Sequence, residues 1–256
     1  MKQNIMIKNY KWSDQQYESH EFAVKEIYKI LDEVFLFLSE NIRWALTDHD
    51  LSEYINGLLE RYELKSSAPP LIAFGLNSSK RNYLPNPSES VIIRRNGWLL
   101  INITAKKNDE NFSENIYADL NTSVILGNST TENEKQLFST VTETRDLCYE
   151  FLKEKVNKKS FVSISEINDL AKKNFSKYKL QKYFSGNSVS ILGKKLSSPK
   201  KSSLHQLKEG AIINIAPSLY TDSIGVKSNL NVIISDFDTK ITNQKQEKIK
   251  YIDTST

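Results

Sequence analysis

The sequence predicts an α+β protein in which helices pack on one side of a curved, mainly antiparallel sheet. Apolar residues recur at helical spacing in two regions, one near the N-terminus and one in the middle of the chain. Each region is followed by short β-branched runs bounded by turn residues. The resulting order of two helices, strands, two helices and strands is typical of an α+β domain.

The composition suits a globular protein. Of its 256 residues, 39% are hydrophobic and 26% charged, and a chain of this length buries about three quarters of its unfolded surface. No apolar run approaches the roughly 20 residues that span a bilayer, the N-terminus lacks a signal-peptide pattern, and the single Cys148 cannot form an internal disulfide. We therefore expect a cytoplasmic protein without a membrane partner. No linker divides the chain, so we expect one domain over 1–256, with a core at about 17–243 and a polar tail at about 244–256 that frays at its end.

Two helices are predicted in the first quarter of the chain. The first begins near Tyr17, and its apolar face is formed by Val24, Ile27, Leu31, Val34, Phe35 and Leu38. The second begins after Thr47, a residue type that caps helix N-termini, and Asp48 and Asp50 in its first turn suit the helix dipole. Ala68-Pro69-Pro70 ends the helical pattern.

Strands are predicted next, at LIAFG (71–75) and at WLLINIT (98–104), whose composition is that of a buried strand. A Pro-rich loop at 84–90 separates them. The polar residues after the second run indicate a long hairpin tip leading to a partner strand at about 115–125.

A second pair of helices is predicted from two capping boxes, in which Thr131 is followed by Glu134 and Ser163 by Glu166. The stretch 210–235, GAIINIAPSLYTDSIGVKSNLNVIIS, then contains two β-branched runs that predict core strands, with turn residues between them.

The same stretch resembles the end of the pita-bread metallopeptidases, the family of methionine aminopeptidase, aminopeptidase P, prolidase and creatinase. In that family a strand ends in Glu-Pro-Gly-Leu-Tyr, and Gly-Ile-Arg-Ile-Glu-Asp precedes the last apolar strand. Here Ala216-Pro217-Ser218-Leu219-Tyr220 and Gly225-Val226-Lys227-Ser228-Asn229-Leu230 stand at those places. Ala216 and Asn229 thus replace both metal-binding glutamates of the family.

Upstream segments extend the resemblance over about residues 17–243, which implies the pita-bread fold. Asn82-Tyr83-Leu84-Pro85 is similar to the family's His-Tyr-x-Pro segment, with Asn82 in place of a substrate-side histidine. Ile101-Asn102-Ile103-Thr104 is similar to Ile-Asp-x-Gly, with Asn102 in place of the first metal aspartate and an insertion in the hairpin that follows. Asp119, in Tyr117-Ala118-Asp119-Leu120-Asn121-Thr122, matches the second metal aspartate.

Two serines take the positions of the family's remaining histidines. Ser190-Ile191-Leu192-Gly193 places Ser190 at the metal histidine, and Ser197, shortly before Pro199, stands at a substrate-side histidine. None of the chain's own histidines fits the site, because His20 and His49 lie in predicted helices and His205 lies in a basic loop.

The resemblance implies that the family's cofactor is a pair of divalent metal ions. The residues at the ligand positions of this chain argue against such a cofactor here. A dinuclear hydrolase needs several carboxylates and an imidazole to hold both ions and activate a bridging water. The positions here hold Asn102, Asp119, Ser190, Ala216 and Asn229, of which one is an anion. We therefore expect no cofactor, and no catalytic residue. Loss of the charges together is physically sensible, because carboxylates crowded without metal would repel one another.

We accordingly expect a catalytically inactive pita-bread homologue, a pseudopeptidase that binds an unknown protein or peptide. One alternative is a divergent metal-dependent aminopeptidase of the Xaa-Pro type. Asp119 is also consistent with a buried structural carboxylate that bonds Asn102 or Asn229, and Cys148 with a core residue rather than a nucleophile.

A further alternative is a nucleic-acid or ribosome-associated binder, because lysines and aromatic residues interleave over 172–208. The set comprises Lys172, Lys173, Lys177, Lys179, Lys182, Lys194, Lys195, Lys200, Lys201 and Lys208, with Phe175, Tyr178 and Tyr183. A solvated face is the preferred interpretation, since arginine is nearly absent, no nucleic-acid motif accompanies the lysines and the net charge is only +4.

Overall fold

The protein has four α-helices in its described residues, and each has a capped N-terminus. The computed structural model describes residues 12–81, 83–193, 195, 207, 209–235 and 238–254. In this part of the chain the α-helices are α1 (Asp14–Asn41), α2 (Asp48–Arg61), α3 (Glu132–Asn157) and α4 (Ile164–Lys177), and the 3₁₀ turns are η1 (Ile42–Trp44), η2 (Gly75–Ser79) and η3 (Gln181–Tyr183).

Each α-helix begins with a capping box, at Ser13, Thr47, Thr131 and Ser163. The cap side chain accepts the backbone N–H of the third helical residue, and the side chain of that residue accepts the cap's own N–H, so two otherwise unpaired donors are satisfied. The predicted cap at Thr47 and the predicted capping boxes at Thr131 and Ser163 are confirmed.

The first sheet is mainly antiparallel. Its strands are β1 (Leu64–Lys65), β2 (Leu71–Phe74), β3 (Gly97–Lys107), β4 (Ala118–Leu126) and β11 (Lys250–Ile252). The order is β1-β3-β4-β11, with β2 also beside β3, and β11 runs parallel to β4. The long hairpin that the assignment of Asn102 requires is present between the end of β3 and the start of β4.

A second, antiparallel sheet has the order β10-β9-β6-β5. Its strands are β5 (Val189–Leu192), β6 (Ile212–Ile215), β9 (Leu230–Ile234) and β10 (Thr239–Ile241), and a separate hairpin consists of β7 (Ser218–Tyr220) and β8 (Gly225–Lys227). The two β-branched runs of 210–235 therefore form neighbouring strands, β6 and β9, as their composition predicts.

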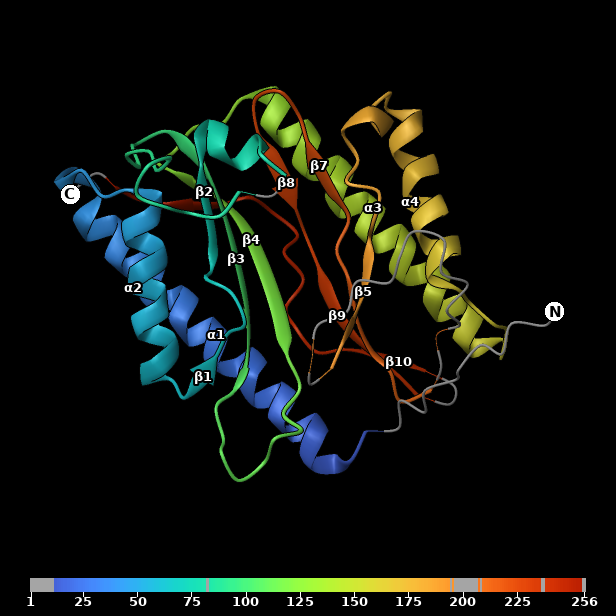
Figure 1. The fold of residues 1–256 in the computed structure, drawn as a ribbon. Helices are drawn as coiled ribbons and strands as arrows, with labels where there is room; N and C mark the ends of the chain where they lie inside the picture. Colours follow the sequence, from blue (N-terminus) through green and yellow to red (C-terminus); the bar gives the residue numbers. More distant parts are fainter. Residues whose placement is uncertain are drawn as a thin grey trace.

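The two sheets face each other across the middle of the molecule, with α1 and α2 on the side of the first and α3 and α4 on the side of the second (Figure 1). One apolar cluster lies between α1, α2 and the first sheet, and another between α3, α4 and the second sheet. Burial of these clusters is the main source of stability. The predicted α+β class with mainly antiparallel strands is confirmed, and the helices cover one side of each of the two larger sheets. The strands form separate ladders rather than one continuous curved sheet.

Part of the predicted polar tail at 244–256 forms a strand, while residues 255 and 256 at its end lie outside the described residues. Residues 250–252 form β11 against the edge of β4, and Ile252 is only 5% exposed within the first core cluster. Gln246 closes the same edge, because its side-chain amide donates to the backbone oxygen of Ser123 and accepts the backbone N–H of that residue. A sheet edge leaves backbone groups that need partners, and this segment supplies them.

None of the helices in the described residues is long and apolar enough to cross a membrane.

Candidate functional site

A pocket of about 370 Å³ lies between the two sheets. Strands β3 to β8 and the loop after η2 all contribute to its wall, which includes Arg81, Asn102, Thr104, Asp119, Ser188, Ser190, Asn214, Ala216, Tyr220 and Lys227. Four of the five predicted metal-site positions therefore line one pocket. The fifth, Asn229, bonds Asn214 in its wall.

Asp119 lies at the centre of this wall and is 7% exposed. The register of β3 and β4 sets Thr104 opposite Asp119 and Asn102 two residues away on the same face. Oδ1 of Asp119 accepts Nδ2 of Asn102 at 2.5 Å and Oγ1 of Thr104 at 2.7 Å. Oδ2 accepts Nδ2 of Asn214 at 2.5 Å. Both carboxylate oxygens thus have protein donors, and the predicted contact with Asn102 is confirmed.

Lys227 brings a positive charge to the same cluster. Its Nζ donates to Oδ1 of Asn102 at 2.5 Å, so the amide of Asn102 lies between the ammonium and the carboxylate of Asp119. The sequence analysis assigned no role to Lys227. It stands at the place of the arginine in Gly-Ile-Arg-Ile-Glu-Asp, the segment of the pita-bread metallopeptidases that this stretch resembles.

The side chain of Asn229 links the two sheets by hydrogen bonds. Its Nδ2 donates to Oδ1 of Asn214 at 2.8 Å and to the backbone oxygen of Asp119, and its Oδ1 accepts the backbone N–H of Asn121 at 3.1 Å. Asn231 also donates to the backbone oxygen of Asp119, at 3.0 Å. Side-chain amides thus replace the backbone ladder that β4 and β9 lack, and the predicted bond of Asn229 goes to the main chain of Asp119 rather than to its carboxylate.

Asn214 is a site residue that sequence reasoning missed. It lies on β6 two positions before Ala216, so both side chains face the pocket. Strand alternation from Ala216 would have pointed to it. Ser190 pairs with Asn214 in the register of β5 and β6, and its hydroxyl has no hydrogen bond to any other described residue.

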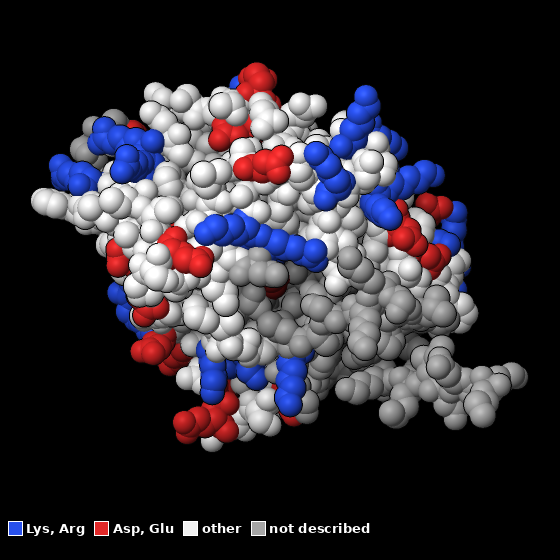
Figure 2. All heavy atoms as spheres, turned by 45° about the horizontal axis from the view of Figure 1, so that its top comes forward, with Lys and Arg blue, Asp and Glu red and all other residues white. Residues whose placement is uncertain are grey.

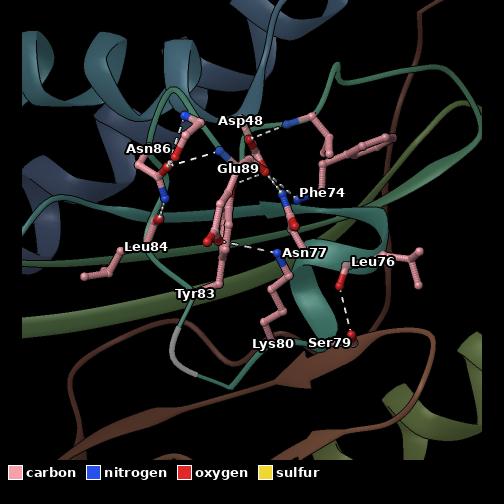
Figure 3. Close-up of polar contacts among 12 residues, drawn as sticks. Asp48, Phe74, Leu76, Asn77, Ser79, Lys80, Tyr83, Leu84, Asn86 and Glu89 are labelled. Carbon is pink, nitrogen blue, oxygen red and sulfur yellow. Dashed lines mark hydrogen bonds and ion pairs between the residues drawn. The ribbon is translucent and has the colours of Figure 1, made fainter.

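Asn82 and Ser197, the predicted substrate-side positions, lie outside the described residues. Described residues before and after this position bond to Asp48, at the first turn of α2 (Figure 3). Oδ2 of Asp48 accepts the hydroxyl of Tyr83 and Nδ2 of Asn77, both at 3.0 Å, and its Oδ1 accepts the backbone N–H of Val91 at 3.1 Å. Burial and the bond to Asp48 raise the pKa of Tyr83 above its usual value, which favours a structural phenol.

Gly225 fixes the hairpin that carries Lys227. A Cβ at this position would lie 1.9 Å from the backbone oxygen of Ser78, so a larger residue does not fit. The Gly225 backbone N–H donates to the Ser78 hydroxyl at 3.0 Å, and its oxygen accepts Nε1 of Trp98 at 2.9 Å. These contacts join β8 to the η2 loop and to β3.

Arg145 on α3 supports the segment before Asn229 from behind. It is fully buried, and its Nη1 donates to Oγ of Ser228 at 2.7 Å and to the backbone oxygen of Gln246 at 2.9 Å. Asp146 pairs with its Nη2 at 2.8 Å. Burial lowers the pKa of Arg145, and the charge of Asp146 opposes that shift.

His20 and Cys148 are buried, in surroundings that favour a structural role over a catalytic one. His20 is fully buried, with Nδ1 at 2.9 Å from the backbone oxygen of Tyr117 and Nε2 at 2.8 Å from Oγ1 of Thr242, and burial lowers its pKa to about 4. Burial raises the pKa of Cys148 to about 12, which disfavours the nucleophilic thiolate. His49 lies in α2, and His205 lies outside the described residues.

Exposed lysines of the interval lie on α4 and just after it, where Figure 2 shows basic side chains with acidic ones among them, and Lys195 lies after β5. Those described are Lys172, Lys173, Lys177, Lys179, Lys182 and Lys195, while Lys194, Lys200, Lys201 and Lys208 lie outside the described residues. Phe175 is fully buried, and the hydroxyls of Tyr178 and Tyr183 donate to Glu143 at 2.6 Å and Asp222 at 3.0 Å. The aromatic residues are therefore engaged by the protein itself, which favours a solvated face over a base-stacking surface.

Residues 23–236 match the sequence profile of metallopeptidase family M24, and the chain belongs to that family. No curated protein sequence matches it. Within the described residues, no group of three or more His, Cys, Asp and Glu side chains is placed to share a metal ion.

Several solved structures share the fold. The X-Pro aminopeptidase of Thermotoga maritima is 15% identical with a TM-score of 0.75, covering 95% of this chain and 65% of its own. A dipeptidase of Pyrococcus horikoshii is 15% identical with a TM-score of 0.76, covering 93% and 63%. The prolidase of Thermococcus sibiricus is 18% identical with a TM-score of 0.74, covering 94% and 62%. This chain thus spans less than two thirds of each, and the predicted pita-bread fold is confirmed.

Proposed function

We propose that this member of family M24 is catalytically inactive, a pseudopeptidase that binds a protein or peptide in the pocket between its sheets. The observation that carries the proposal is the state of Asp119. Its two carboxylate oxygens accept three side-chain hydrogen bonds, two at Oδ1 and one at Oδ2. Lone pairs engaged in this way are not directed at a metal ion.

The donor set does not fit two divalent ions. Such a pair needs several anionic carboxylates and an imidazole. The five positions offer the carboxylate of Asp119, two amides, the hydroxyl of Ser190 and the methyl group of Ala216. Lys227 adds a positive charge one amide away from Asp119, which disfavours a second cation there.

The pocket remains suitable for binding. A volume of about 370 Å³ is in the range of small-ligand sites, and its wall carries amide, hydroxyl and cationic groups that can bond peptide groups. Cationic and hydroxyl donors on a preformed wall can orient an extended ligand without any bond being cleaved.

Metal content tests the inactive state. We expect purified protein, incubated with manganese, cobalt or zinc and dialysed, to retain well below one equivalent per chain by elemental analysis. We also expect no hydrolysis of Xaa-Pro peptides in the same preparations. Retention near two equivalents together with release of the N-terminal residue would refute the proposal and establish the Xaa-Pro aminopeptidase alternative, which the family and the similar structures favour.

A variant that carries the family's ligand types provides the matched control. Asn102→Asp, Ser190→His, Ala216→Glu and Asn229→Glu together restore four ligands beside Asp119. We expect this variant to retain more manganese than the parent, provided that its thermal unfolding remains cooperative. An active X-Pro aminopeptidase treated in parallel shows that the dialysis step leaves a genuine dinuclear site loaded.

A further inference from the structure

The pocket wall carries more positive than negative charge among the described residues. Its titratable acidic and basic side chains among the described residues are Arg81, Asp119 and Lys227. The oxygens of Asp119 are already engaged by three neutral donors, whereas the two cations retain free N–H groups. Lys227 uses one of its three donors on Asn102, and Arg81 is exposed and makes no hydrogen bond or ion pair with another described residue.

Two hydroxyl groups on the same pocket wall lack partners among the described residues. Ser188 is 1% exposed, and its Oγ has no hydrogen-bond partner among the described residues. Ser190, two positions further on in β5, is half-buried and likewise has no side-chain partner in that part of the chain. A buried hydroxyl without a partner is uncommon in native proteins, and a ligand oxygen that accepts from it would supply the missing bond.

We propose that the pocket recognises an oxyanion between Arg81 and Lys227, and that the oxyanion is the C-terminal carboxylate of a peptide. The inference rests on the proposed binding role and adds the chemical class of the ligand. Charged donors form short, strong bonds with carboxylates, and the planar guanidinium can hold both carboxylate oxygens at once. The site thus accepts an anion in the pocket that contains the positions of the family's metal ligands.

Paired peptides that differ only in charge provide the first test. Binding of Ala-Pro-Ala with a free C-terminus is compared by calorimetry with binding of the same peptide as its C-terminal amide. We expect the free acid to bind about tenfold more tightly, since one charge-assisted hydrogen bond has about that effect on an equilibrium constant. We also expect the difference to shrink as salt is added. Free alanine is measured in the same samples, so that cleavage is detected.

Single variants then test the two residues. Arg81→Gln and Lys227→Met should each weaken binding of the free acid about tenfold and leave binding of the amide unchanged. Arg94→Gln and Lys173→Met, which change exposed residues outside the pocket, are the matched controls. Because Lys227→Met also leaves Asn102 without a donor, its thermal unfolding is measured, and the exposed Arg81 supplies a test that does not depend on it.

The outcomes separate this inference from the proposed function. Equal binding of acid and amide overturns the anion site and leaves peptide binding intact. Binding of inorganic phosphate that depends on Arg81, without binding of either peptide, supports the anion site and overturns the peptide role. Absence of binding by all three probes overturns both, and release of alanine overturns the inactive state.

Discussion

The side-chain amide of Asn102 lies between two opposite charges, accepting a hydrogen bond from Lys227 and donating one to Asp119, both at 2.5 Å. Each charge polarises the amide in the direction that strengthens the other bond. The carboxylate and the ammonium are therefore satisfied through a neutral group, in a pocket where carboxylates without metal would otherwise repel one another. Among the described residues that line the pocket, Asp119 is the one acidic side chain.

Asn102→Ala should destabilise the protein by about 1–3 kcal/mol, because it leaves Lys227 without its acceptor and Asp119 with one donor fewer. Urea unfolding gives the free energy. Asn56→Ala is the matched control, since among the described residues the side chain of Asn56 bonds only the exposed Glu53 on the same helix, and its effect should stay within about 0.5 kcal/mol. Equal effects of the two substitutions would show that the amide of Asn102 is not part of a stabilising network.

Arg145→Met should destabilise the protein by about 3 kcal/mol. The substitution removes a buried cation whose bonds join α3 to Ser228 and to Gln246, and it leaves both acceptors without that donor. Asp146 keeps its exposed partner Lys245, at 2.7 Å, which moderates the loss. Lys158→Met, which breaks an exposed pair with Glu154, should change the free energy of unfolding by less than about 1 kcal/mol.

The effect of Arg145→Met can also be measured at the amides beside the pocket. Ser228 precedes Asn229, so release of this segment should also disturb the amides that bond Asp119. We expect the amide proton of Asn121, which bonds Asn229, to exchange faster in Arg145→Met than in the Lys158→Met control. Unchanged exchange would limit Arg145 to a local role on α3.

His20 should make stability depend on pH. Burial lowers its pKa from 6.5 to about 4 in the folded protein, so the unfolded chain binds a proton more readily. The stability that neutral His20 contributes is therefore complete above about pH 6.5 and is lost progressively as the pH falls toward 4. The full loss is about 3 kcal/mol, since each unit of pKa shift is worth about 1.4 kcal/mol.

Comparison with His20→Gln isolates this effect, because carboxylates titrate alike in both proteins. The free energy of unfolding, measured in urea between pH 7.5 and 4.5, should fall more steeply for the parent than for the variant, which cannot take up the proton. Parallel curves would contradict a buried neutral His20.

Local patterns in the sequence predicted most of the elements, and the reasons for the omissions are physical. Capping boxes and β-branched runs are signals within a few residues, so Thr131, Ser163 and strands β6 and β9 were found. The convergence of Asn102, Asp119, Ser190 and Ala216 on one pocket followed from the family resemblance.

Contacts over long separations were missed. The bond of Arg145 to Ser228 spans 83 positions, and no periodicity marks either residue. Lys227 was assigned no role from the sequence, because only the folded hairpin places it against Asn102. Strand β11 has three residues, one of them buried, too few for strand alternation to be recognised.

Ile252→Ala provides the test of that last strand. Ile252 is 5% exposed and packs in the first core cluster, so the substitution should destabilise the protein by about 2 kcal/mol through lost burial and the cavity it leaves. Tyr251, its neighbour on the same strand, is 44% exposed, and Tyr251→Ala should have a much smaller effect on the urea midpoint. If both substitutions are neutral, the segment frays in solution as its polar composition alone predicts. A large effect confined to Ile252 would establish β11 as part of the first sheet, because only a docked strand distinguishes its two faces.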